Sequence, residues 1–213
     1  MIKTYKTVIM ANGQFPTKPL PLASLHAAEY LIATDGAVDA LHTHGLRPNA
    51  IVGDSDSLPD KYKTIYAKRV YISSEQETND LTKAVNFAKK KGCDELLILG
   101  ATGLREDHSI ANISLLTEYA PHFKRVEMLS DYALFTPALQ TATYTSTPGQ
   151  QVSIFSIDPE TTITTEGLKW PVKNHRFNNW WQGTLNEATG PRFTIALSEG
   201  ARVIVCRDLL TNP

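Results

Sequence analysis

The chain has 213 residues and a net charge of −1 at pH 7, and 42% of its residues are hydrophobic. This length can bury a sizeable core, but the balanced charge offers no basic excess with which to displace the counterions of a nucleic acid. No apolar stretch approaches the ~18 residues that cross a bilayer, and two distant cysteines make no disulfide framework. We therefore expect a reduced, soluble, cytoplasmic protein that binds neither nucleic acid nor membrane.

Six short aliphatic runs in the first two thirds of the chain are typical of strands covered on both faces. They occupy residues 6–11, 30–34, 49–53, 69–73, 95–100 and 125–129. Helical periodicity lies between them, most clearly over residues 79–92 and again over 107–120. This alternation predicts an α/β fold with a Rossmann-like parallel sheet.

The composition changes near residue 139, where Thr, Ser and Pro become frequent and helical periodicity disappears. Four further runs are typical of strands, at residues 150–157, 161–170, 192–198 and 201–206. We predict an α/β catalytic domain at residues 1–138, followed by a small all-β sandwich domain at 139–213. About 70 residues make a small core, so the second domain should lean on the first or on a second copy of itself.

In a parallel sheet, the loops that follow the strands meet at one edge, where ligands bind. Here these loops carry Asn12-Gly13, Asp35-Gly36, Gly53 to Ser57, Ser73 to Asp80, and Ala101 to His108. Taken singly, each acid fits a turn, a helix cap or the first turn of a helix. Taken together, carboxylates crowded at one edge repel one another unless something neutralises them.

A hard cation is the natural neutraliser, because Mg²⁺ prefers oxygen ligands and joins one or two carboxylates to substrate phosphates. Asp54 and Asp56 are two residues apart, so their side chains project the same way from an extended segment. Arg105 offers a planar fork for phosphate oxygens. Neither GxxxxGK[ST] nor GxGxxG occurs. We therefore predict a magnesium-dependent site for a phosphorylated ligand, with a nucleotide as the favoured candidate, built without either motif.

The motifs, in this order, resemble those of the thiamine pyrophosphokinase family. They read ANG (11–13), TDGAVDAL (34–41), GDSDS (53–57), ETNDLTKA (77–84), GATGLREDHSIAN (100–112), EGLKW (166–170) and GTLNEATG (183–190). The resemblance implies an enzyme that transfers a diphosphate group from ATP to the hydroxyl of thiamine, giving thiamine diphosphate and AMP. It also implies a homodimer, with thiamine bound between the α/β domain of one subunit and the β domain of the other.

The resemblance also suggests roles for individual residues. The expected catalytic residues are Asp54, Asp56, Asp80, Arg105 and Asp107, and the first three would hold Mg²⁺. The residues expected around ATP are Asn12, Asp35, Gly36, Ser57, Thr102, Gly103 and His108. The residues expected at thiamine are Trp170, Leu185 and Asn186.

Three residues depart from the family pattern. Glu77 replaces the first Asp of DxxD, Leu104 replaces the second glycine of GGR, and Leu185 replaces the serine of the late SN motif. Leu104 would restrict the backbone if that position required a left-handed conformation. Leu185 keeps open a related diphosphotransferase with another acceptor, and Leu104 with Glu77 keeps open a non-catalytic relative that binds a nucleotide or thiamine.

Overall fold

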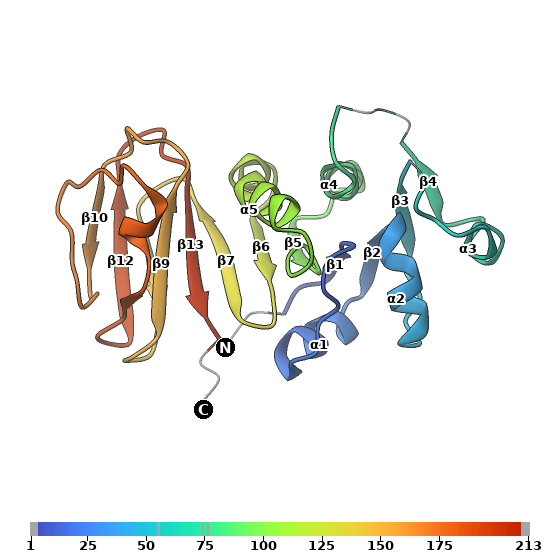
Figure 1. The fold of residues 1–213 in the computed structure, drawn as a ribbon, viewed down its shortest axis with the longest axis horizontal. Coiled ribbons are helices and arrows are strands. Elements are labelled where there is room, and N and C mark those ends of the chain that lie inside the picture. Colours follow the sequence, from blue (N-terminus) through green and yellow to red (C-terminus); the bar gives the residue numbers. More distant parts are fainter. Residues whose placement is uncertain (1–3, 55, 74, 76, 210–213) are drawn as a thin grey trace. The chain divides into compact units, whose positions relative to one another are not determined.

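The structure is a computed structural model that describes residues 4–54, 56–73, 75 and 77–209. Ser55, in the GDSDS segment, lies outside the described residues. The chain divides into two compact units (Figure 1). The first unit comprises residues 1–112 and 121–131, and the second comprises residues 113–120 and 132–213. The domain boundary at 138–139 stays a prediction.

The described part of the first unit contains a parallel sheet with the strand order β4-β3-β2-β1-β5-β6. Its strands are β1 (Thr7–Met10), β2 (Tyr30–Thr34), β3 (Ala50–Gly53), β4 (Val70–Ile72), β5 (Glu95–Leu99) and β6 (Arg125–Leu129). All four residues of β1 and of β3 are buried, as the continuous aliphatic runs predicted. For β4 the prediction of coverage on both faces is wrong, because β4 is the edge strand and its Tyr71 and Ile72 are exposed. The strand order reverses between β1 and β5, and such a reversal opens a crevice at the carboxyl ends of the strands.

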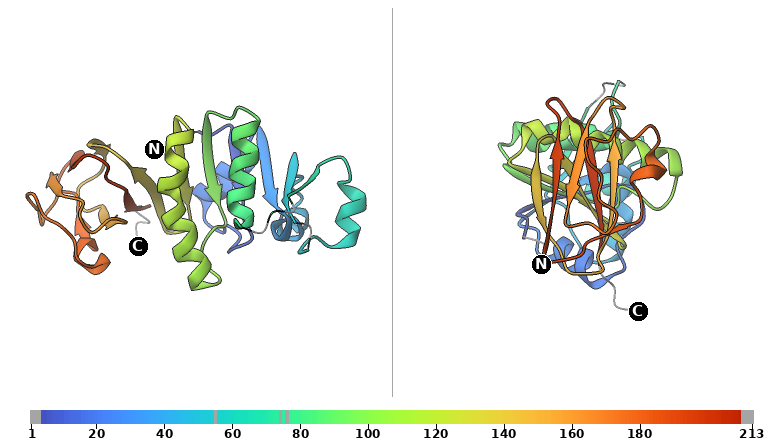
Figure 2. Two further views of the ribbon diagram at one scale, coloured as in Figure 1. Left: turned by 90° about the horizontal axis from the view of Figure 1, so that it is seen from above. Right: turned by 90° about the vertical axis from the view of Figure 1, so that its left-hand side faces the viewer.

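Helices connect these strands. They are α1 (Pro19–His26), η1 (Asp35–Ala37), α2 (Val38–Thr43), α3 (Asp60–Ile65), α4 (Asp80–Lys90) and α5 (Glu106–Tyr119), followed by η2 (Ala120–His122). Helix α4 packs against β2 and β3 (Figure 2). Its buried face includes Leu81, Ala84, Val85 and Ala88, so the helix predicted at residues 79–92 is confirmed. Asn79 caps this helix, because its Oδ1 accepts a hydrogen bond from the backbone amide of Thr82 at 2.9 Å.

The second unit is built from antiparallel strands in two groups. One group has the order β11-β9-β13-β7 and the other β10-β12-β8. Their bounds are β7 (Ala133–Ala138), β8 (Ala142–Thr145), β9 (Gln151–Ser156), β10 (Ile163–Glu166), η3 (Trp180–Gly183), β11 (Asn186–Glu187), β12 (Arg192–Leu197) and β13 (Val203–Asp208). Strand β9 alternates buried and half-buried residues. Its Val152 and Ile154 share one core with Phe193 and Ile195 of β12. The predicted α/β-then-β fold class is confirmed.

Asp131, just after β6, holds the start of α1 in place. Its carboxylate accepts hydrogen bonds from the amide of Thr17 at 3.0 Å and from the amide of Lys18 at 3.1 Å, as well as from the Thr17 hydroxyl. Helix α1 begins with Pro19 and also contains Pro21. Because proline has no N–H to donate, the amides that Asp131 binds at this helix start come from the two residues before the helix, Thr17 and Lys18. Burial alone would raise the pKa of Asp131, but the hydrogen bonds from Thr17 and Lys18 outweigh it and lower that pKa.

An Asp131→Asn substitution should therefore destabilise the protein in a pH-dependent way. A depressed folded-state pKa stabilises the fold above the unfolded pKa, and this contribution is lost as the pH falls through the folded pKa. At pH 7 we expect a loss of roughly 1–3 kcal/mol of unfolding free energy. The difference from wild type should shrink between about pH 5 and pH 2 in urea titrations. Asp60→Asn, at an acid whose side chain is 94% exposed, is the control and should change little. A pH-independent difference for Asp131→Asn would contradict this account.

Candidate active site

A pocket of about 500 Å³ lies at the carboxyl ends of the strands of the first unit. The segments that follow β1, β3, β4 and β5 line it, together with Thr34 at the end of β2 and the first turns of α4 and α5. The structure thus brings together the loops that the sequence predicted to converge. The position agrees with the rule that open α/β sheets bind ligands where the strand order reverses.

The predicted residues divide into those that line this pocket and those that support it. The lining includes Asn12, Asp54, Ser57, Asp80, Thr102, Arg105 and His108. The others lie beside it: Asp35, Gly36, Asp56, Gly103 and Asp107 follow the same strands but do not line it. Glu77, also predicted to matter, does not line the pocket either, and its backbone amide donates to Glu75 at 3.0 Å.

Asp54 and Asp80, from separate segments, share the ammonium group of Lys83. The Lys83 Nζ lies 3.2 Å from Asp80 Oδ1 and 3.7 Å from Asp54 Oδ2. The Lys83 side chain is only 3% exposed. Burial lowers the pKa of Lys83, but Asp80 and Asp54 outweigh this effect, so the net shift is upward and the ammonium stays charged. The sequence alone did not indicate Lys83, although its i+3 spacing from Asp80 on a predicted helix was a usable signal.

Asp35 adds a third, more deeply buried carboxylate. Its Oδ1 accepts the amide of Gly36 at 2.7 Å. Its Oδ2 is buried and has no hydrogen-bond partner among the described residues. Burial raises the pKa of Asp35, and the charges of Asp80 and Asp54 raise it further. An unsatisfied acceptor beside two other carboxylates favours the arrival of a cation or a hydrogen-bond donor.

Asp56 does not line the pocket. Its side chain is exposed, while its amide donates to Asp54 Oδ1 at 3.1 Å. This amide is the main cause of the lowered pKa of Asp54. Among the described residues, no group of three or more His, Cys, Asp or Glu side chains is arranged to hold a metal ion. The set Asp54, Asp56 and Asp80 is thus not assembled as a three-carboxylate cluster, and the part of Asp56 in metal binding stays a prediction.

Arg105 is engaged by Asp107 at the start of α5. The Nη2 and Nε atoms of Arg105 donate to the two carboxylate oxygens of Asp107 at 2.5 and 3.1 Å. Arg105 lowers the pKa of Asp107. Both side chains are exposed, and an exposed ion pair costs little to open. The guanidinium can therefore exchange Asp107 for an oxyanion entering the pocket.

The turn before α5 accommodates Leu104 without strain. Gly103 has φ +92°, whereas Leu104 is not among the described non-glycine residues with positive φ. The left-handed position of this turn is thus still occupied by glycine. The exposed Leu104 side chain contributes to the pocket lining instead.

Two asparagines that the sequence did not single out tie α4, α5 and the β5 loop together. Asn112 donates from Nδ2 to the carbonyl oxygen of Ala101 at 2.9 Å. Its Oδ1 accepts Nδ2 of Asn79, the α4 cap, at 3.1 Å. Both asparagines line the pocket, so these bonds fix the spacing of its walls.

Two glycines allow the loops to approach this closely. A Cβ atom at Gly53 would lie 2.7 Å from Cγ of Asp35, and one at Gly36 would lie 2.2 Å from Nδ2 of Asn12. Such distances are far below van der Waals contact. A side chain at either position would therefore force the facing Asn12 or Asp35 side chain to shift.

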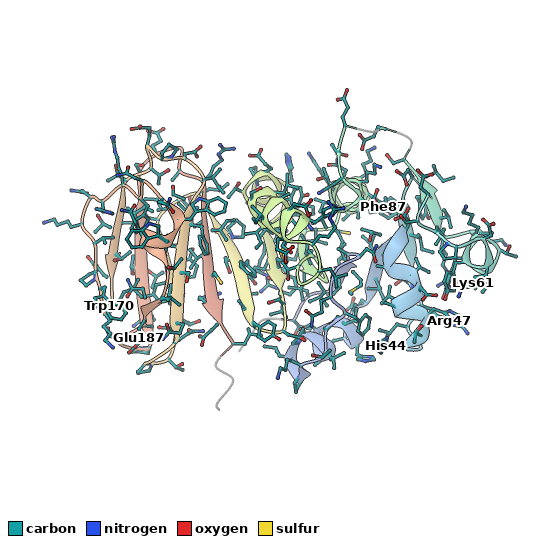
Figure 3. The ribbon with its side chains drawn as sticks, viewed as in Figure 1. His44, Arg47, Lys61, Phe87, Trp170 and Glu187 are labelled. Atoms are coloured by element: carbon teal, nitrogen blue, oxygen red, sulfur yellow. The ribbon has the colours of Figure 1, made fainter. Side chains whose placement is uncertain are left out.

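A second, smaller pocket of about 260 Å³ lies wholly in the second unit. Trp170 and Asn186 line it, with Phe177 and Ile154 among its apolar residues. Asn186 uses both ends of its amide on the Trp170 backbone: Oδ1 accepts the amide at 3.1 Å and Nδ2 donates to the carbonyl at 2.8 Å. Asn186 thus positions Trp170, which is labelled in Figure 3. The Lys169 ammonium lies over the Trp170 ring, 4.9 Å from its centroid.

Leu185 behaves differently from its neighbours. It is 71% exposed, does not line the second pocket, and has φ +58°. Its amide donates to the Ser153 hydroxyl at 3.2 Å, which holds this unusual backbone conformation. A contact between Leu185 and thiamine stays a prediction.

Two family models match the chain: thiamin pyrophosphokinase, catalytic domain, over residues 23–129, and thiamin pyrophosphokinase, substrate-binding domain, over residues 133–205. The chain belongs to the thiamin pyrophosphokinase family. The first match covers the β2, β3, α4 and β5 segments that form most of the larger pocket, and the second covers Trp170 and Asn186. The family resemblance inferred from the motifs is confirmed.

Relatives agree with this assignment. Thiamine pyrophosphokinase 1 of Oryza sativa subsp. japonica is 31% identical over 143 residues, which are 60% of this chain and 54% of that protein. Thiamine pyrophosphokinase of Bacillus subtilis (strain 168) is 33% identical over 119 residues, 52% of this chain and 54% of that protein. The matches thus span about half the length of these curated relatives.

Solved structures support the fold. A thiamin pyrophosphokinase from Geobacillus thermodenitrificans has a TM-score of 0.77 and 24% identity, covering 97% of this chain and 98% of that chain. A thiamin pyrophosphokinase from Candida albicans has a TM-score of 0.78 and 16% identity, covering 96% of this chain and 89% of that chain. Among the described helices, none combines the length and the hydrophobicity that a membrane span requires.

A Gly53→Ala substitution should destabilise the first unit. The added methyl group would collide with the buried Asp35 carboxyl group, and we expect a loss of about 1–3 kcal/mol of unfolding free energy. Gly190→Ala is the matched control, because a Cβ atom there meets nothing within 4 Å and φ is not positive. It should be neutral or slightly stabilising in the same denaturant titration. Equal effects of the two substitutions would show that Gly53 is not sterically constrained.

Proposed function

We propose that this protein is a thiamine diphosphokinase, which transfers a diphosphate group from ATP to the hydroxyl of thiamine and releases AMP. One observation carries the proposal most directly: Asp54 and Asp80, from two separate segments, converge on one positive charge inside the pocket of the first unit. Family membership supplies the substrates by analogy, since the relatives that match this chain are named thiamine pyrophosphokinases.

The pocket of the first unit suits the polyphosphate of ATP. The Arg105 guanidinium can leave the exposed Asp107 and form bidentate hydrogen bonds with phosphate oxygens. His108, Thr102 and Asn12 add polar groups around the same space. The absence of a Walker motif is no obstacle, because backbone amides and a fixed arginine can bind phosphate without one.

The acids of this pocket suit a magnesium ion. Mg²⁺ typically uses one or two carboxylates together with substrate phosphates, so Asp54 and Asp80 can suffice, with Asp56 as a further candidate. The buried, unsatisfied Oδ2 of Asp35 adds negative potential at the same place. When bound, the ion would compensate the charge of the transferring phosphates.

The chain itself contributes mainly positioning and electrostatics. In a loose phosphoryl-transfer transition state, the attacking hydroxyl, the β-phosphorus and the leaving AMP oxygen must lie in line. The thiamine oxygen forms a bond to the β-phosphorus while the bond from that phosphorus to the AMP oxygen breaks. Arg105 stabilises the phosphate charge, and a carboxylate of the Asp54, Asp56 and Asp80 group accepts the hydroxyl proton.

The pocket of the second unit is our candidate for thiamine. The Trp170 ring attracts cations, since the Lys169 ammonium already lies over it, and a thiazolium ring is cationic. Asn186 fixes the backbone of Trp170. We propose a homodimer in which each active site combines the first unit of one subunit with the second unit of its partner. A cytoplasmic location stays a prediction.

The proposed reaction can be tested by measuring AMP and thiamine diphosphate formed from ATP, Mg²⁺ and thiamine. Asp54→Asn should lower turnover by about 10²-fold or more, because it removes a charge that acts on the transferring group. Asp39→Asn is the control, since Asp39 pairs with Lys61 and Tyr62 outside the pocket. Wild-type turnover no faster than that of Asp54→Asn would overturn the enzyme proposal. AMP formed only with another alcohol would favour the alternative acceptor, and binding without turnover would favour a non-catalytic relative.

A Trp170→Ala substitution should weaken thiamine binding by roughly tenfold, as expected for the loss of an aromatic face against a cation. Trp181→Ala is the matched control, because Trp181 is 71% exposed and does not line the pocket. Calorimetric titration with thiamine gives the dissociation constant of each variant, so the contributions of the two tryptophans can be compared. A larger loss in Trp181→Ala would move the thiamine site away from this pocket.

A further inference from the structure

Lys83 lies where a lysine is least expected on its helix. The last turn of α4 carries Lys89 and Lys90, at the end where the helix dipole favours positive charge. Lys83 instead lies three residues after the start of α4, and its side chain is 3% exposed. A buried ammonium near a helix N-terminus is unfavourable unless nearby groups compensate it.

The compensating groups are Asp80 and Asp54, at 3.2 and 3.7 Å from the ammonium. These are also the two carboxylates best placed to hold a divalent cation. An ammonium and a metal ion repel each other and need the same oxygen atoms. Lys83 must therefore compete with any divalent cation that enters this pocket alone.

A polyphosphate changes the balance. Lys83 lines the same pocket as Arg105 and His108. An ammonium displaced from the carboxylates can therefore pair with phosphate oxygens without leaving the pocket, and lysine binds phosphate well as a point charge. The cation would then hold the carboxylates while Lys83 holds the phosphates, so that every charge remains paired.

We propose that Lys83 is a positioning residue that makes binding of a divalent cation and binding of a polyphosphate depend on each other. This inference rests on the proposed nucleotide site, but it requires neither thiamine nor turnover. Each ligand alone binds weakly, because the cation must displace Lys83 and the polyphosphate must draw Lys83 away from two carboxylates. Together they bind tightly, and the coupling is reciprocal by thermodynamic linkage.

The test uses Mn²⁺ alone and tripolyphosphate alone as probes, measured by calorimetric titration of the full chain. Lys83→Gln removes the competing charge, so we expect Mn²⁺ to bind about tenfold tighter or more in the absence of any phosphate. Tripolyphosphate in the presence of EDTA should bind about tenfold more weakly to the same variant. Lys90→Gln, at an exposed lysine of the same helix, should match wild type in both titrations.

Opposite changes for the two probes distinguish this role from a purely structural one, because a loosened fold would weaken both. Unchanged or weaker Mn²⁺ binding in folded Lys83→Gln would overturn the proposal. Lys83→Arg keeps the charge and should bind Mn²⁺ as weakly as wild type does. Tighter Mn²⁺ binding by Lys83→Arg would also overturn the proposal, even if Lys83→Gln failed to fold.

The outcomes separate this inference from the proposed reaction. If the protein forms no AMP but the Mn²⁺ and tripolyphosphate affinities of Lys83→Gln shift in opposite directions, the coupling is supported and the enzyme proposal is contradicted. If the protein forms AMP normally but Lys83→Gln leaves the Mn²⁺ affinity unchanged, the enzyme proposal is supported and the coupling is contradicted.

Discussion

Three carboxylates, those of Asp35, Asp54 and Asp80, occupy one edge of a parallel sheet, and their mutual repulsion is the constraint on which this site depends. Lys83 compensates two of them directly, while Asp35 accepts the Gly36 amide on one carboxylate oxygen and its other oxygen is unsatisfied among the described residues. Charge compensation in the protein is therefore incomplete. A site of this kind is poised to accept further positive charge, which is the physical basis for assigning it to a metal-assisted reaction of phosphates.

The fold brings these acids together through buried elements. Strand β3, which Asp54 follows, is buried along its whole length, and β2, which Asp35 follows, is buried except at Tyr30. Helix α4, which begins at Asp80, packs against both strands. The Asn79–Asn112 hydrogen bond and the Asp131 contacts with Thr17 and Lys18 add local ties at helix starts. The Arg105–Asp107 pair, by contrast, is exposed, so a ligand can separate it at little cost.

Much of this could be predicted from the sequence, because the relevant signals are local. Aliphatic runs indicated the buried strands, the spacing of Leu81, Ala84, Val85 and Ala88 indicated α4, and the polar segments after the strands indicated the edge where the pocket lies. Lys83 was missed because its meaning depends on Asp54, which lies in another loop. A lysine within a helical pattern ordinarily indicates a solvent-exposed face. Two features of the second unit were missed for the same reason. The Asn186 amide binds the Trp170 backbone at both ends, and Leu185 has a left-handed backbone. Both depend on tertiary contacts that no local pattern encodes.

The close contact of Gly53 with Asp35, and of Gly36 with Asn12, has a consequence for how this sequence can vary. Each glycine is fitted to a polar side chain from a different loop, so neither member of a pair can be changed independently without a clash or a void. Viable routes to a different ligand specificity should therefore pass through paired substitutions, in which the polar residue becomes smaller before or together with the glycine becoming larger. Combinatorial libraries that vary these four positions jointly should therefore contain more folded variants than libraries that vary the glycines alone.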